Sequence, residues 1–303
     1  MKEFLTFSAE VSAAQRDGRA IVALESTIIT HGMPYPQNLR TAEQVEAEVR
    51  AAGAVPATIA VMGGRIHIGL EPDELARLAQ SPDAMKLSRA DLGACLAVGR
   101  TGATTVAATM ICAHLAEIAV FATGGIGGVH RGASDTFDIS ADLYELARTP
   151  VAVVAAGAKA ILDLPKTLEV LESLGVPVIA YGQRDFPAFW SRSSGLTAPL
   201  TMQSPEEIAG AIASRRALGI GGGHLVANPI PTEAEIPQEV IAPLIEKALA
   251  DAAEKSINAK AVTPFLLARI FELTEGRSLS ANIALVLNNA RLASAIALCL
   301  QKR

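Results

Sequence analysis

Short apolar runs alternate with segments of helical periodicity along this chain, and that alternation limits the fold more than any other feature. The runs have the length and β-branched content of strands buried on both faces, at 20–24, 118–123, 150–156, 177–180 and 224–227. Helical patterns fill the intervals, at 40–52, 71–80, 91–99, 160–173, 209–218, 237–258, 263–275 and 281–301. Such alternation predicts an α/β fold, a three-layer α/β/α sandwich around a mostly parallel sheet.

Two local signals refine this expectation. Apolar runs on either side of Gly63–Gly64 predict a hairpin, so we expect a mixed sheet. Thr41 and Gln44 have the spacing of a capping box at the start of the first helix.

Aromatic residues make up only 4% of a chain that is 50% hydrophobic, which predicts a core of small and aliphatic side chains. No linker-like stretch divides the sequence, so we expect one domain over residues 1–303.

The sequence argues against three classes of protein: membrane proteins, secreted proteins and nucleic-acid-binding proteins. The longest uninterrupted apolar runs, 151–158 and 292–300, are about half of the ~20 residues that a spanning helix needs. Residues 1–20 lack the apolar region of a signal peptide. Widely spaced cysteines in apolar surroundings suggest core residues in a reducing cytoplasm. A net charge of −5 without a basic cluster argues against a nucleic-acid partner.

A glycine-rich segment, Gly124 to Gly128, directly follows one predicted strand. It matches neither the dinucleotide fingerprint nor the phosphate loop of nucleotide hydrolases, because the third glycine and the Gly-Lys pair are missing. Successive glycines can still direct backbone N–H groups at an anion, and His130 and Arg131 follow at once. We expect an anion or ligand site here; a tight structural loop is the alternative.

Acidic residues come next, at Asp135, Asp138 and Asp142. Carboxylates suit a hard cation such as Mg²⁺ or Mn²⁺. The alternative is structural, because Ser140 is a typical N-cap and acids in a first helical turn complement the helix dipole.

Lys159 is unusual among the few lysines of the chain, because it lies just past a buried strand and after Gly157. Open α/β sheets bind ligands at such strand ends. Apolar surroundings are expected to lower the pKa of its amine and favour a Schiff-base nucleophile. The alternative is a lysine in a first helical turn that reaches solvent.

Three further features are candidates. Glu25 at another strand end is a possible acid or base, or else a helix cap or an ion-pair partner. Asn282 and Asn289 share one face of the last helix, and a ligand is one partner they could have. The aromatic loop 185–190 is either a binding wall or a packing plug.

Several long segments, in order and spanning about residues 20–295, resemble the pseudouridine-5'-phosphate glycosidase family, also called the indigoidine synthase A-like family. They include ALESTIITHGMPYPQN, KLSRADL, TGATTVAATM, FATGGIGGVHRGASDTFDISADL, GAKAILDLPKTLE and SLSANIALVLNNA. The resemblance implies reversible cleavage of the C–C glycosidic bond of pseudouridine 5'-phosphate to uracil and ribose 5-phosphate. A lysine would form a Schiff base with the ring-opened ribose.

The resemblance also implies roles for particular residues. Lys159 matches the Schiff-base lysine, Glu25 the proton-transferring carboxylate and Asp142 a Mn²⁺ ligand, with Mg²⁺ as another possible cation. The implied substrate contacts are Lys86, Thr105, Val106, His130, Ser140 and Asn282. The family is trimeric, so the resemblance implies a homotrimer. We expect it in the cytoplasm, as the cysteine pattern also suggests. A Schiff-base lyase for another sugar phosphate and a non-catalytic sugar-phosphate-binding protein are the competing hypotheses.

Overall fold

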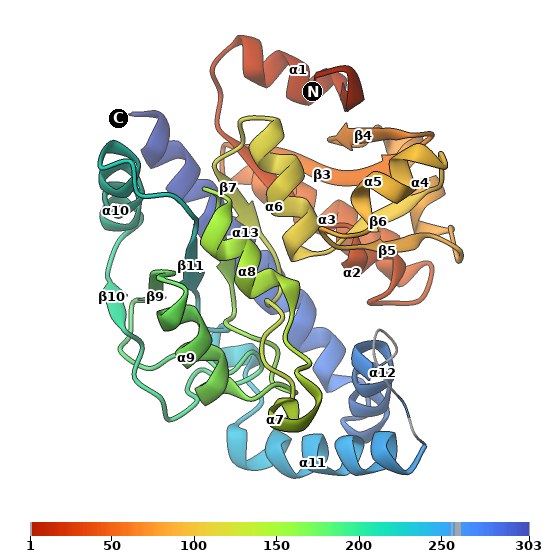
Figure 1. Cartoon of the computed structure of the whole chain (residues 1–303), viewed down its shortest axis with the longest axis vertical. Helices are drawn as coiled ribbons and strands as arrows, with labels where there is room; N and C mark the ends of the chain where they lie inside the picture. The colour runs from red at the N-terminus through yellow and green to blue at the C-terminus, as the bar shows by residue number, and fades with distance from the viewer. Residues whose placement is uncertain (1, 256, 258–261, 303) are drawn as a thin grey trace.

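The computed structural model describes residues 2–255, 257 and 262–302, and an eleven-stranded sheet runs through it (Figure 1). The strands are β1 (Leu5–Phe7), β2 (Ile21–Leu24), β3 (Val55–Met62), β4 (Arg65–Ile68), β5 (Met85–Leu87), β6 (Gly102–Thr104), β7 (Val120–Ala122), β8 (Ala152–Ala155), β9 (Val178–Tyr181), β10 (Leu200–Met202) and β11 (His224–Ala227). Their order is β1-β4-β3-β2-β7-β8-β11-β9-β10, and β5 pairs with β6, which branches from β3.

Nearly all strand pairs are parallel. The exceptions are β3 with β4 and β3 with β6, which are antiparallel. The β3–β4 pair is the hairpin predicted at Gly63–Gly64, where φ angles of 56° and 74° suit glycine in a tight hairpin turn. The mixed, mostly parallel sheet predicted from the sequence is therefore confirmed.

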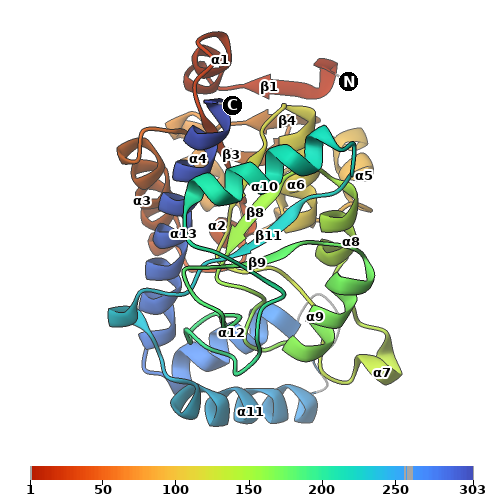
Figure 2. The same cartoon turned by 90° about the vertical axis from the view of Figure 1, so that its left-hand side faces the viewer.

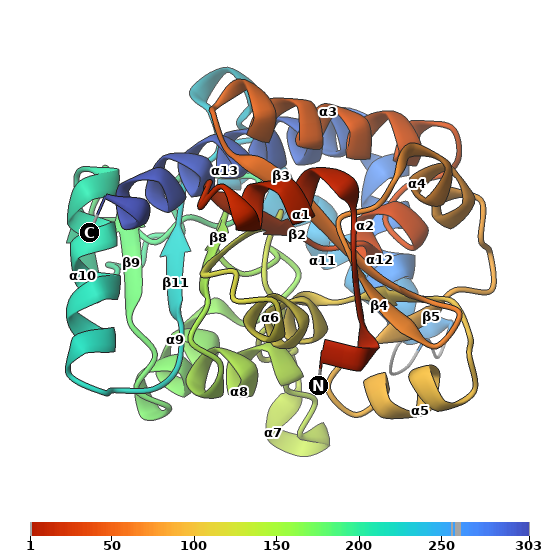
Figure 3. The same cartoon turned by 90° about the horizontal axis from the view of Figure 1, so that it is seen from above.

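Helices cover both faces of this sheet. They are α1 (Ala9–Arg16), α2 (Thr27–Thr30), α3 (Gln37–Ala51), α4 (Pro72–Ala79), α5 (Leu92–Ala97), α6 (Val106–Leu115), α7 (Ala133–Thr136), α8 (Ala141–Arg148), α9 (Leu164–Ser173), α10 (Pro205–Ala217), α11 (Gln238–Glu254), α12 (Val262–Leu273) and α13 (Arg277–Gln301), with short 3₁₀ turns η1 (Lys2–Phe4) and η2 (Thr232–Ala234). Figure 3 shows α3 and α13 on one side of the strands and α6 and α8 on the other. The predicted three-layer sandwich is confirmed.

The helices α11 and α12 stand apart from these layers. They lie at one end of the molecule, beyond the strand ends (Figures 1 and 2). They contact each other, and α12 also contacts α13. The last residues of the helix expected over 237–258, at 256 and 258, lie outside the described residues.

Among the described residues, α13 is the one helix long and apolar enough to cross a membrane by length and composition alone. Polar residues such as Asn288, Asn289 and Arg291 interrupt it, which is why the sequence showed no long uninterrupted apolar run. Half of its most apolar window is buried, and it packs on β2, β7, β8 and α3. A core helix passes the same test, so this finding is weak evidence for a membrane span.

Four predicted helix starts are wrong. The helices expected from 209 and from 281 begin four residues earlier, at Pro205 and Arg277. The capping box at Thr41 does not form, because α3 begins four residues earlier at Gln37 and Thr41 lies inside it, buried. The helix expected from 160 begins instead at Leu164, where the Asp163 side chain accepts the N–H of Lys166 at 3.1 Å. Lys159 therefore lies in the loop between β8 and α9, not in a first helical turn.

Candidate functional site

A cavity of about 380 Å³ opens where β2, β7 and β8 end. These strands are neighbours and run parallel, so the residues that follow them meet at one edge of the sheet. Each strand supplies a part of the lining: Glu25 follows β2, Gly124 and Gly125 follow β7, and Lys159 follows β8. Every site residue that the family resemblance implied lines this cavity: Glu25, Lys86, Thr105, Val106, His130, Ser140, Asp142, Lys159 and Asn282. Of the other candidates, Arg131, Asp135 and Asn289 are not part of its lining.

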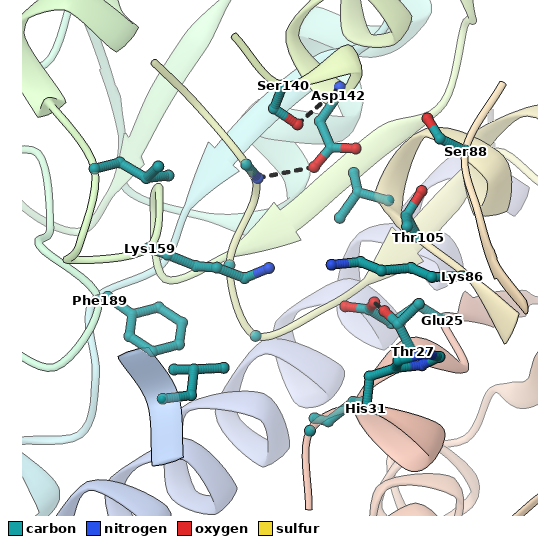
Figure 4. A pocket seen from close by; sticks show the side chains of 18 of the residues that line it. Glu25, Thr27, His31, Lys86, Ser88, Thr105, Ser140, Asp142, Lys159 and Phe189 are labelled. Carbon is teal, nitrogen blue, oxygen red and sulfur yellow. Dashed lines mark hydrogen bonds between the residues drawn. The ribbon is translucent and has the colours of Figure 1, made fainter. Parts of the chain in front are cut away.

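Two lysines enter the cavity from opposite sides. Lys159 comes from the loop after β8, where its backbone N–H donates to the Ile126 carbonyl at 3.1 Å, and its side chain is half-buried. Lys86 comes from β5, in the branch of the sheet that β6 joins to β3. Figure 4 shows the two ammonium groups pointing toward each other across the cavity, with Glu25 beside Lys86. An amine and a carboxylate thus converge on one space, as nucleophilic and proton-transfer chemistry requires.

The carboxylate of Glu25 is held by two hydroxyl groups. The Thr27 side chain, at the start of α2, donates to one oxygen, and the Thr123 side chain, just past β7, donates to the other. Both donors stabilise the charged carboxylate and fix its direction. The N-cap residue of α2 is Ser26, so Glu25 is not a helix cap.

Two histidines line the cavity near the lysines. Burial lowers the pKa of His130, and the positive charges of Lys159 and Lys86 lower it further, although Asp138 opposes them. Burial and the charge of Lys86 likewise lower the pKa of His31, whose Nδ1 lies 2.6 Å from the Thr30 hydroxyl. Both rings are therefore held toward the neutral form, and protonation is opposed until an anion arrives.

Asp142 joins three parts of the cavity wall. Its Oδ2 accepts the backbone N–H of Gly127 at 2.8 Å, and its Oδ1 accepts the backbone N–H of Ala107 at 2.9 Å. The carboxylate is only 7% exposed. Ser140 caps the same helix, because its hydroxyl accepts the N–H of Asp142 at 3.2 Å. Thr105 and Val106 open α6 beside this junction, so one side chain fixes the glycine loop, α6 and α8.

Asp138 differs from Asp142 in its surroundings. It precedes the N-cap of α8, so Asp138 and Asp142, although four residues apart, do not share a helical face. Its carboxylate lines the cavity, is 45% exposed, and has Oδ2 at 3.9 Å from Nδ1 of His130. Within the described part of the chain, no group of three or more His, Cys, Asp or Glu side chains is arranged to hold a metal ion. A cation here would need water for most of its ligands.

The two asparagines of α13 have different partners. Asn289 is fully buried, and its amide pairs with Asn228 at 3.0 Å and with the Thr123 carbonyl at 2.8 Å. Asn282, two turns earlier, lines the cavity. Both asparagines thus have a partner within the protein, because Asn282 accepts the indole N–H of Trp190 at 2.7 Å, but only Asn282 also lines the cavity.

The sequence missed several residues of the wall. No functional role was predicted from the sequence for His31 or Ser88, although Ser88 follows Lys86 by two residues and both His31 and Ser88 line the cavity. Phe189, from the loop 185–190 that was one candidate for a binding wall, does form an aromatic wall, in a left-handed conformation with φ of 63°. Leu267 of α12 lies on the same cavity. The only sequence signal for His31 was its place in the segment that follows Glu25.

The fold and the cavity define an α/β protein with a ligand site at the carboxyl edge of its sheet, equipped with paired amines and a carboxylate. The family model for indigoidine synthase A like protein matches residues 10–299. The chain belongs to this family.

Several proteins of known name or structure are similar to the whole chain. A protein from Paracoccus denitrificans is 70% identical over 98% of both chains, and one from Caldanaerobacter subterraneus is 56% identical over all of this chain and 98% of its own; both are named pseudouridine-5'-phosphate glycosidase. The prealnumycin C-glycosynthase AlnA, solved in complex with ribulose 5-phosphate, is 37% identical, with a TM-score of 0.92 over 99% of this chain and 98% of its own. An indigoidine synthase A-like protein from Thermotoga maritima is 33% identical, with a TM-score of 0.89 over 98% and 97%.

Proposed function

We infer that this chain is a pseudouridine-5'-phosphate glycosidase, an enzyme that reversibly cleaves the C–C glycosidic bond to give uracil and ribose 5-phosphate. The observation that carries the proposal is the convergence of Lys159, Lys86 and Glu25 in one cavity (Figure 4). The names of the relatives, at up to 71% identity over 97% of both chains, support the same activity.

The bond to be broken determines what the site must do. A C–C glycoside has no leaving oxygen that an acid could protonate, so the two-carboxylate route for O-glycosides does not apply. We propose a covalent route instead, in which the amine of Lys159 bonds to C1' and the C1'–O4' bond breaks, with a proton going to O4'. The nitrogen lone pair then forms the C=N bond of the Schiff base as the C1'–C5 bond to uracil breaks.

Glu25 provides the proton that this cleavage needs. Carbon 5 of uracil leaves with the electron pair of the broken bond and must be protonated. The carboxylate of Glu25 first accepts a proton from the ammonium group of Lys159, which frees the amine for attack, and then delivers that proton to carbon 5. Water then adds to the Schiff base, which releases ribose 5-phosphate and the free amine of Lys159. The reverse sequence joins uracil and ribose 5-phosphate.

The phosphate group has a positively charged place to bind. Lys86, His130 and Ser140 line the cavity together with the glycine loop, whose backbone N–H groups suit phosphate oxygens. Phosphate binding would favour the protonated form of His130, which offsets the burial that lowers its pKa. Thr105 and Val106 lie on the same cavity, where we place the uracil contacts.

A divalent cation fits this site as a sparsely ligated ion. Both oxygens of Asp142 already accept backbone N–H groups, whereas the more exposed carboxylate of Asp138 faces the cavity with no such donor. We therefore propose Asp138, in place of Asp142, as the side chain that would hold Mn²⁺ or Mg²⁺, with water completing the shell. When bound, the cation would neutralise and orient the phosphate oxygens.

The decisive experiment is reduction with borohydride in the presence of ribose 5-phosphate. We expect a mass increase of one reduced pentose phosphate on Lys159, and release of uracil from pseudouridine 5'-phosphate by the wild-type chain but not by Lys159→Ala. Lys166, which is exposed and paired with Asp163 at 2.9 Å, is the matched control, and Lys166→Ala should keep both properties. Uracil release by Lys159→Ala at the wild-type rate would disprove the covalent route.

The homotrimer and the cytoplasmic location remain predictions. Light scattering coupled to size exclusion measures the number of chains, and a mass other than three chains would contradict the trimer.

A further inference from the structure

The aromatic loop from 185 to 190 packs its rings against the cavity wall. Phe186, Phe189 and Trp190 are 0%, 5% and 1% exposed. Phe189 alone of these lines the cavity, and its ring takes the space that a Cβ at Gly125 would need, at 2.7 Å. The Phe189 and Trp190 rings form an edge-to-face pair, with centroids 5.0 Å apart at 71°. The loop is thus both a wall and a packing plug.

Trp190 makes a polar contact that packing alone does not require. Its indole N–H donates to Oδ1 of Asn282 at 2.7 Å and, more weakly, to the Ser278 carbonyl at 3.2 Å. An indole is a donor without an acceptor, so it can pair only with the oxygen of the asparagine amide. This contact fixes the orientation of the amide, whose NH₂ group must then lie on the side away from the indole.

We propose that Trp190 is a positioning residue that holds the NH₂ group of Asn282 toward the ligand, so that this subsite selects a hydrogen-bond acceptor. A sugar oxygen or a carbonyl oxygen of the base has that chemistry. The proposal rests on the proposed function only for the identity of the ligand. Asn289 on the same helix shows the contrast, because its amide is fully paired within the protein and supports the fold.

Two substitutions test the Trp190–Asn282 hydrogen bond and the NH₂ donor of Asn282 separately. Trp190→Phe keeps an aromatic ring but lets the Asn282 amide rotate, so KM for pseudouridine 5'-phosphate should rise ~3- to 10-fold, about the worth of one hydrogen bond. Asn282→Asp keeps an oxygen for the indole but replaces the NH₂ donors by a second oxygen. It should raise KM more than Trp190→Phe does, without lowering the melting temperature.

A double-mutant cycle tests whether Trp190 acts through Asn282. In the Asn282→Ala background, Trp190→Phe should leave KM unchanged, because no amide remains to be positioned. The matched control is Asn288→Ala, which removes an amide of the same helix whose NH₂ group donates to the Pro229 carbonyl at 3.1 Å. In that background, Trp190→Phe should raise KM by the same factor as in the wild type.

Fluorescence gives a second readout, because Trp190 is the only tryptophan of the chain. Saturating ribose 5-phosphate should change the tryptophan emission of the wild type and of Asn288→Ala, and should leave that of Asn282→Ala unchanged. If Trp190→Phe raises KM equally in the wild-type and Asn282→Ala backgrounds, or not at all, the positioning role is wrong. Failure of the wild type to release uracil would instead contradict the glycosidase, while the fluorescence titration would still test the role of Trp190.

Discussion

Gly127 donates its backbone N–H to Oδ2 of Asp142 at 2.8 Å, and a Cβ at Gly127 would lie 2.6 Å from the Cβ of Ser140. The glycine loop therefore approaches α8 more closely than any other residue type would allow. This contact fixes the loop that carries the proposed phosphate donors. Gly127 is needed for space and not for a left-handed conformation, since its φ is not positive.

Gly127→Ala should push the loop away from α8. We expect a loss of ~1–3 kcal/mol in the free energy of unfolding, as for other overpacked sites, and a rise in KM of at least about tenfold. Urea unfolding and steady-state kinetics measure the two effects. Gly221→Ala serves as the comparison, since a Cβ there would meet nothing within 4 Å and its φ is not positive. Equal KM values for the Gly127→Ala and wild-type chains would contradict the prediction.

Asp138→Asn and Asp142→Asn should have different effects. The amide introduced by Asp142→Asn can accept only one of the two backbone N–H groups, so this variant should lose ~1–3 kcal/mol of stability. Asp138→Asn should keep the wild-type stability but weaken Mn²⁺ binding, measured by titration calorimetry with the metal alone. Unchanged Mn²⁺ affinity in Asp138→Asn, together with its loss in a folded Asp142→Asn, would return the ligand role to Asp142.

Lys86→Gln should raise the pKa of both His31 and His130. The lysine charge opposes protonation of each ring, so its removal favours the charged form. NMR titration of the imidazole Cε1 protons measures both values. His224, whose pKa is lowered by burial and by the charge of Arg215 and which does not line the cavity, is the internal control, and Lys86→Gln should leave its titration unchanged. Unshifted titrations of His31 and His130 would show that Lys86 does not lie near them in solution.

His224 should make the fold sensitive to acid. Burial, followed by the charge of Arg215, lowers its pKa from 6.5 to about 4. Because the unfolded chain then binds a proton more readily, the contribution to stability is present above pH 6.5 and is lost as the pH falls from 6.5 to about 4. Chemical unfolding across this range should give a shallower pH dependence for His224→Gln than for the wild type. Parallel curves would contradict the assignment.

Arg89→Lys should loosen one side of the cavity. The guanidinium of Arg89 makes two hydrogen bonds of 2.7 Å to Glu145, which is 1% exposed and joins α8 to the segment that carries Lys86. A lysine cannot reproduce the bidentate contact, so we expect a loss of ~2 kcal/mol in stability and a higher KM. Arg291→Lys, at a similar pair with Glu48 far from the cavity, should leave KM unchanged. A wild-type KM for Arg89→Lys would limit its role to stability.

Much of this architecture could be predicted from the order of residues along the chain. Apolar strands that alternate with helices give a parallel sheet, and residues that follow neighbouring parallel strands must share an edge. Glu25, the glycine loop and Lys159 all follow such strands, so their proximity depends on local pattern and sheet direction. Four helix starts were predicted wrongly, because periodicity alone does not show where a helix is capped, as at Asp163 before α9 and Ser204 before α10.

Other parts of the site were decided only by the tertiary structure. Lys86 reaches the cavity because β5 joins β6 and β6 joins β3 in a branch of the sheet that no periodicity reveals. Asn282 reaches it because α13 packs across β2, β7 and β8, far from those strands in sequence. The sequence by itself determined which chemistry stands at the strand ends. Only long-range packing decided which amine faces Lys159, which carboxylate is engaged by backbone N–H groups, and how the amide of Asn282 is oriented, because each depends on contacts between distant segments.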